Sequence, residues 1–103
     1  MRTLADHFRT IDALHALATE YPLLPAPDMR TTSDMPGDLL VSVMNLDGFE
    51  QWREALHVDA DSIEYELTSL GQARLVAETR FAGATVLLHG YGPTPSQRKA
   101  QAA

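Results

Sequence analysis

Residues 62–91 read SIEYELTSLGQARLVAETRFAGATVLLHGY, in which three strand-like stretches are separated by two short turn signals. The first stretch alternates strictly between apolar and polar residues, which is typical of a half-buried strand. Ser69-Leu70-Gly71 and Ala82-Gly83 each place a glycine where a tight turn needs a left-handed residue. The pattern predicts three consecutive antiparallel strands, at 62–68, 73–81 and 84–91.

The two turns also predict which residues lie opposite each other. A two-residue turn at 82–83 pairs Val76 with His89, and a three-residue loop at 69–71 pairs Tyr65 with Leu75. The two registers agree, and a slip of one residue would move a whole apolar set to the wrong face. One face is therefore expected to hold Ile63, Tyr65, Leu67, Leu75, Ala77, Phe81, Val86 and Leu88.

The opposite face of this predicted sheet mixes charged and apolar side chains. Its expected members are Glu64, Glu66, Arg74, Val76, Glu78, Arg80, Leu87, His89 and Tyr91. The apolar members need cover from water, and the charged members need partners. We expect this mixed face to be a contact surface.

The residues before Ser62 predict one more strand and a helix. Residues 39–44 are rich in β-formers and indicate a buried strand. Asp47 is expected to cap a helix over 47–57, with Trp52 in its apolar stripe. Strand, helix and three further strands make a βαβββ domain over 39–92, with the helix covering the apolar face.

The N-terminal segment predicts a separate helix within residues 1–20. Thr3 and Asp6 have the spacing of a capping box. A proline-rich connection follows at 21–38, and a flexible tail is expected at 93–103. The predicted fold class is thus α+β: an N-terminal helix followed by a βαβββ unit with a mostly antiparallel four-stranded sheet.

Composition excludes several classes of function. The chain has 103 residues, which suits one domain, and a formal net charge of -6, which disfavours binding to nucleic acid. It has no cysteine, so a disulfide, a thiol nucleophile or a cysteine-bound metal is impossible. No apolar run approaches the roughly 20 residues of a membrane span. We expect a cytoplasmic protein without nucleic-acid or membrane partners.

Complete catalytic motifs are absent from the sequence. It contains neither Gly-x-Ser-x-Gly nor His-Glu-x-x-His. We therefore predict no catalytic residue, cofactor or metal, and we lean against an enzyme. The candidate ligand-binding residues are His89, Glu78, Tyr91 and Arg74, because a neutral imidazole near a carboxylate can act as a base or a ligand. The alternative is an ordinary ladder of ion pairs on a strand surface.

The βαβββ order from residue 39 resembles one module of the vicinal oxygen chelate superfamily, which includes glyoxalase I and the bleomycin-resistance proteins. Residues 47–56, DGFEQWREAL, are similar to the helix that precedes the second strand of that module. The resemblance implies a site built between two modules, with His89 at the last-strand position. The first predicted strand offers no second metal ligand.

Residues 49–56 (FEQWREAL) and 88–93 (LHGYGP) are also similar to small uncharacterised proteins of actinobacteria and their phages. That resemblance implies a host and a mobile-element context, and it implies no activity.

Two interpretations of function stay open. The first is a small acidic non-enzymatic interaction protein that forms a homodimer and binds a protein partner. The second is a small-molecule binding protein or metalloenzyme of the vicinal oxygen chelate kind. We expect the dimer contact at the mixed face or at helix 3–20. Helix 47–57 covers only one side of the sheet, and helix 3–20 is the only other apolar element.

Overall fold

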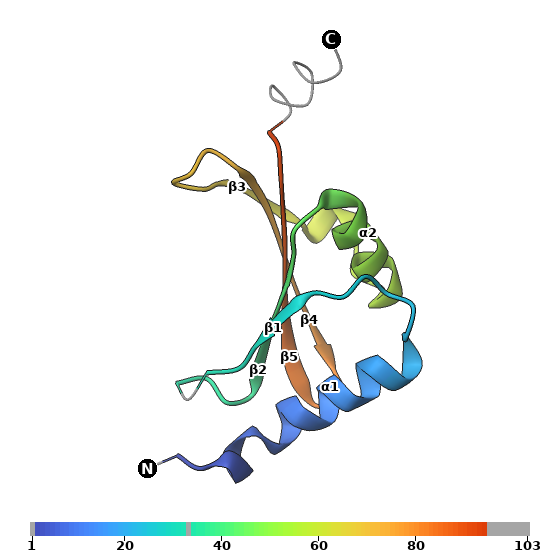
Figure 1. Ribbon diagram of the computed structural model, residues 1–103, viewed down its shortest axis with the longest axis vertical. Coiled ribbons are helices and arrows are strands. Elements are labelled where there is room, and N and C mark those ends of the chain that lie inside the picture. The colour runs from blue at the N-terminus through green and yellow to red at the C-terminus, as the bar shows by residue number, and fades with distance from the viewer. Residues whose placement is uncertain (1, 33, 95–103) are drawn as a thin grey trace.

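A computed structural model describes residues 2–32 and 34–94, which form a five-stranded sheet with two helices packed on one face (Figure 1). The strands lie in the order β1-β2-β5-β4-β3; β2 and β5 are parallel, and the other neighbours are antiparallel. In chain order the elements are η1 (Leu4–His7), α1 (Phe8–Glu20), β1 (Asp28–Arg30), β2 (Asp38–Val43), α2 (Leu46–Ala55), η2 (Ala60–Ser62), β3 (Glu64–Leu67), β4 (Ala73–Phe81) and β5 (Ala84–Gly92).

The α+β class is confirmed, and the sheet is mostly antiparallel as expected. It has five strands instead of four, and the pairing of β2 with β5 is parallel. The additional strand is β1, which lies inside the segment predicted to be a connection. It pairs with the free edge of β2, placing Met29 opposite Val41. A strand of three residues just after a proline carries too little local pattern to be predicted, and tertiary pairing alone specifies it.

Both predicted hairpin registers are confirmed. Val76 lies opposite His89 across β4 and β5, and Tyr65 lies opposite Leu75 across β3 and β4. Because paired residues share a face, the expected membership of the mixed face is confirmed as well. Because β2 pairs with β5, and β1 with β2, residues of β1 and β2 also lie on this face.

The turns behave as their sequences predict. Ala82 and Gly83 both have positive φ, at 50° and 84°, as a two-residue primed hairpin turn requires. In the three-residue loop, the Thr68 N–H donates to the Gln72 carbonyl at 2.9 Å, and Gly71 has φ 78°. Local turn chemistry therefore sets the register of the antiparallel strands.

Helix α2 starts slightly earlier than predicted. Its cap is Asn45, whose Oδ1 accepts a hydrogen bond from the Gly48 N–H at 2.5 Å, so Asp47 lies in the first turn instead. Phe49 and Trp52 are buried against the sheet. Phe49 packs so closely over Gly90 of β5 that a Cβ there would lie 2.6 Å from its ring.

The N-terminal helical segment begins with a short 3-10 turn before α1. The Thr3 N–H donates to the Asp6 carboxylate at 2.7 Å, as the capping-box spacing predicts. Leu17 of α1 joins the same buried cluster as Phe49 and Trp52 of α2, so both helices cover the same side of the sheet (Figure 1).

This placement corrects the expectation that helix 47–57 alone covers the apolar face. Helix α2 has 10 residues and is therefore about 15 Å long. Strand β5 has 9 residues and spans about 30 Å. One short helix covers half of that length, and α1 covers the remainder, so α1 is not available to cover the mixed face.

The β3–β4 hairpin extends past the helices (Figure 1). Tyr65 and Leu67 lie on the helix side of the sheet as predicted, but they are 53% and 65% exposed because neither helix reaches them. No helix within the described part of the chain is long and apolar enough to cross a membrane. The expected flexible tail falls, from residue 95 on, outside the described residues.

Candidate functional site

The side of the sheet opposite the helices is an open face that crosses all five strands. We call it the open face. It holds Asp28 and Arg30 of β1, Asp38, Leu40 and Ser42 of β2, Thr85, Leu87, His89 and Tyr91 of β5, Arg74, Val76, Glu78 and Arg80 of β4, and Glu64 and Glu66 of β3. Its apolar centre consists of Leu40, Val76 and Leu87, which are half-buried by their neighbours alone.

Three of the four residues predicted for the site meet in one polar network on the open face. The Arg74 Nε–H donates to Oε2 of Glu66 at 2.7 Å, and these two side chains form an ion pair. Arg74 also interacts with Tyr91, and both partners raise the pKa of its guanidinium. The Tyr91 hydroxyl lies 3.5 Å from Nδ1 of His89, and the two rings meet edge to face with centroids 6.4 Å apart.

The surroundings of His89 lower its pKa and so favour the neutral form of its imidazole. Partial burial lowers the pKa of His89 below its ordinary 6.5, the nearby Arg74 charge lowers it further, and Glu66 opposes the shift. A neutral imidazole next to a tyrosine hydroxyl can accept or donate one hydrogen bond. Such a group suits recognition of a polar partner on this face.

Glu78 does not join this network. It is exposed and lies opposite Leu87, two residue pairs along the β4–β5 ladder from the pair that contains His89. With Glu64 and Val76 it lines a separate hollow of about 310 Å³. The carboxylate whose charge acts on His89 is instead that of Glu66, which also pairs with Arg74. The register already paired Glu66 with Arg74, but nothing in the sequence ranked it above Glu78.

A larger hollow of about 510 Å³ lies where β1 and β2 meet the end of β5. Arg30, Leu40, Ser42 and Tyr91 line it, together with Asp28. Sequence reasoning missed Asp28, Arg30 and Ser42, because the strand that carries the first two was not predicted and Ser42 belonged to a strand expected to be buried. The hollow therefore joins the Tyr91 end of the network to the edge of the sheet.

Within residues 2–32 and 34–94, no three His, Asp or Glu side chains gather closely enough to hold a metal ion. Comparisons with protein-family models, with curated protein sequences and with solved structures returned no match for this chain. The open face and its chemistry are thus the basis for inferring function.

The lowered pKa of His89 predicts a loss of stability in mild acid. The unfolded chain takes up a proton near pH 6.5, while the folded chain resists protonation until a lower pH. The stability that neutral His89 contributes is therefore present above about pH 6.5 and is lost as the pH falls through the lowered folded pKa. We expect wild type to lose more free energy of unfolding between about pH 7.5 and pH 5 than His89→Gln, measured by urea denaturation at fixed protein concentration.

His15→Gln is the control for the loss of an imidazole, because His15 is exposed on α1. It should keep the wild-type dependence on pH. An equal dependence in wild type and His89→Gln would contradict the assignment of the acid effect to His89.

Proposed function

We propose that this chain is a non-enzymatic interaction module whose open face binds a second copy of itself. The observation that carries the proposal is the half-buried apolar centre, Leu40, Val76 and Leu87, which no helix of the described chain covers. Both helices pack on the other side, and burial of exposed apolar surface drives association.

Charge supports a second copy as the occupant of the open face. Three arginines, Arg30, Arg74 and Arg80, lie on it among five carboxylates, so the face carries a minor part of the chain's negative charge. The carboxylates belong to Asp28, Asp38, Glu64, Glu66 and Glu78. The whole chain has a formal net charge of -6. Two copies that meet through the open face therefore keep the larger part of their negative charge away from the contact, and each offers both signs of charge to the other.

The size of the open face fits a modest, reversible dimer. Five strands about 4.8 Å apart and about 20 Å long cover about 500 Å². Two such faces bury about 1,000 Å², which is at the lower end for specific complexes. We therefore expect association in the micromolar range and a mass that depends on concentration.

We further propose that the dimer binds a basic protein partner. Since the open face has only two more carboxylates than arginines, most of the net charge of -6 belongs to the rest of the chain. Asp12 and Glu20 of α1 and Glu54 of α2 are exposed on the helix side, which stays accessible in such a dimer. An acidic surface of this kind steers a basic partner toward the protein.

The variant Leu87→Asp tests the proposed dimer. A carboxylate in the centre of the face would be buried without a partner, so we expect the dimer to weaken by about 100-fold or more. Sedimentation equilibrium across the micromolar range measures the change. Leu87 is only half-buried within one chain, so circular dichroism should still report a folded monomer.

Leu23→Asp is the matched control. Leu23 is 94% exposed on the segment between α1 and β1, and it lines a shallow hollow with Glu20 of α1 and Gln51 of α2 on the helix side. This variant should associate as wild type does. Equal weakening by both substitutions, or a wild-type mass near 11.3 kDa at every concentration, would contradict the proposal. In the second case the open face would have to bind a different protein.

The hollow of about 510 Å³ favours a second candidate, a small-molecule site of the vicinal oxygen chelate kind closed by a second copy. Arg30, Ser42 and Tyr91 would offer polar contacts there, next to His89. Thermal-shift measurements with divalent metals and small carboxylates test it. A saturable rise in Tm that Tyr91→Phe reduces would favour this candidate over a purely structural dimer.

A further inference from the structure

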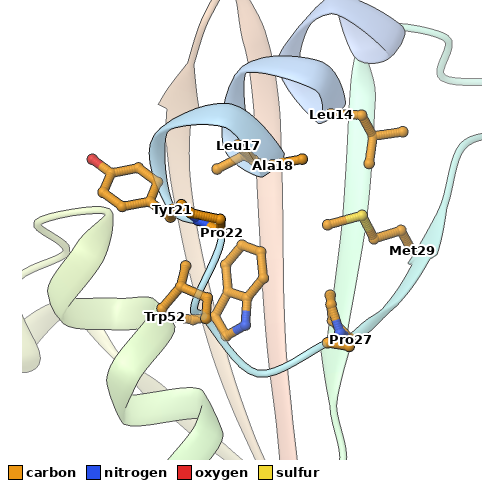
Figure 2. Close-up of a pocket in the computed structure, with 10 residues that line it drawn as sticks. Leu14, Leu17, Ala18, Tyr21, Pro22, Pro27, Met29 and Trp52 are labelled. Carbon is orange, nitrogen blue, oxygen red and sulfur yellow. The ribbon is translucent and has the colours of Figure 1, made fainter.

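A separate cavity of about 280 Å³ lies on the helix side of the sheet, away from the open face (Figure 2). It lies between the C-terminal end of α1, the segment 21–27, strand β1 and helix α2. The side chains that surround it belong to Leu14, Leu17, Pro22, Pro27, Met29 and Trp52. None of the side chains that line it is charged.

The polar side-chain groups near the cavity are already used or turned away. The Trp52 indole Nε1–H donates to the Pro25 carbonyl at 2.9 Å, so it has no hydrogen left for a ligand. The Tyr21 hydroxyl points out of the cavity in Figure 2. Pro22, Pro25 and Pro27 have no backbone N–H to donate. An anion or a strongly polar ligand would therefore lose hydration without receiving a side-chain donor in return.

The wall of the cavity is held in place from several sides. The Leu24 N–H donates to the Tyr21 carbonyl at 3.2 Å, and Trp52 holds Pro25 from α2. Pairing of β1 with β2 fixes the other end of the segment. Because prolines also stiffen the backbone, the cavity is preformed and does not collapse onto its lining.

We infer that this cavity binds an uncharged, apolar small molecule. An apolar cavity of about 150 Å³ holds one benzene ring and stays free of water when empty. On that scale this cavity takes roughly ten carbon atoms, as in a bicyclic aromatic compound or an alkyl chain with its end at the mouth. The inference does not depend on the dimer, since the cavity and the open face lie on opposite sides of the sheet.

The chain has one tryptophan, and it lines the cavity, so it reports occupancy directly. Octan-1-ol is a suitable probe because it is uncharged and does not absorb where tryptophan emits. We expect saturable shifts of the Trp52 emission and of its indole N–H resonance, with a rise in Tm. Octane-1,8-diol, which carries polar groups at both ends, should bind at least about tenfold more weakly, because one hydroxyl must be buried without a partner.

Ala18→Leu places a larger side chain at the exposed edge of the cavity, on α1. It should weaken octanol binding by about tenfold or more, because the ligand and the leucine compete for the same space. Ala5→Leu is the control, since Ala5 is exposed in η1 and does not line the cavity. It should bind octanol as wild type does.

The position of bound octanol on the wild-type protein tests the inference even if Ala18→Leu fails to fold. Nuclear Overhauser contacts from octanol to Trp52 and Met29 would support the inference. Contacts to the exposed Leu4 and Phe8 instead, or no saturable shift at all, would overturn it. A Trp52 shift that follows protein concentration without any probe would also overturn it, by assigning the cavity to a second copy.

Discussion

Replacing Trp52 with alanine is expected to lower the free energy of unfolding by roughly 3–5 kcal/mol. Trp52 is 3% exposed and belongs to the buried cluster that joins α1, α2 and the sheet. Its indole also holds the 21–27 segment through the carbonyl of Pro25. A domain of this size has about 5–15 kcal/mol in total, so the variant should melt far lower or fail to fold, as circular dichroism against temperature will show.

Trp52→Phe separates packing from the hydrogen bond. Phenylalanine keeps an aromatic ring in the cluster and loses the bond to Pro25, so we expect a smaller loss of about 1–2 kcal/mol. A Tm for Trp52→Ala within a degree or two of wild type would show that the side chain is not part of the core.

Gly90→Ala is expected to destabilise the chain by about 1–3 kcal/mol, although it adds one methyl group. The new Cβ would lie 2.6 Å from the Cβ and ring of Phe49, which is 1% exposed and has no room to move. Either α2 shifts away from β5 or the phenylalanine leaves its rotamer. Urea denaturation measures the change in the free energy of unfolding.

Gly37→Ala is the matched control, because a Cβ at Gly37 would meet nothing within 4 Å. That substitution should leave stability unchanged or raise it slightly by restricting the unfolded chain. Equal stability of Gly90→Ala and wild type would mean that α2 does not pack over β5 as closely as described.

Local signals explain why much of the sheet was predictable. The turns at 69–71 and 82–83 contain the residues that their geometry demands, and they fix the registers of β3, β4 and β5. The parallel pairing of β2 with β5 and the short strand β1 have no such local signal. No local signal predicts which side of the sheet α1 covers either. That depends on how much of the length of β5 the shorter helix α2 leaves uncovered.

The candidate site was also predictable only where the hairpin registers determine it. Arg74, His89 and Tyr91 share a face because the hairpin register places them there. Choosing Glu66 over Glu78 needed the direction of the Arg74 side chain, which a register does not provide. The hollow beside Tyr91 needed β1, and the apolar cavity needed the path of a proline-rich segment. The resemblance to a vicinal oxygen chelate module and the resemblance to small actinobacterial and phage proteins are not tested by these features. Both stay predictions.

The proposed dimer is tested most directly by isotope-filtered NMR on an equal mixture of labelled and unlabelled protein at high micromolar concentration. If the open face binds a second copy, cross-peaks between the two copies should arise from the methyl groups of Leu40, Val76 and Leu87. Leu87→Asp should remove them. The absence of such cross-peaks, or cross-peaks from Phe8 and Ile11 of α1 in their place, would contradict the proposal.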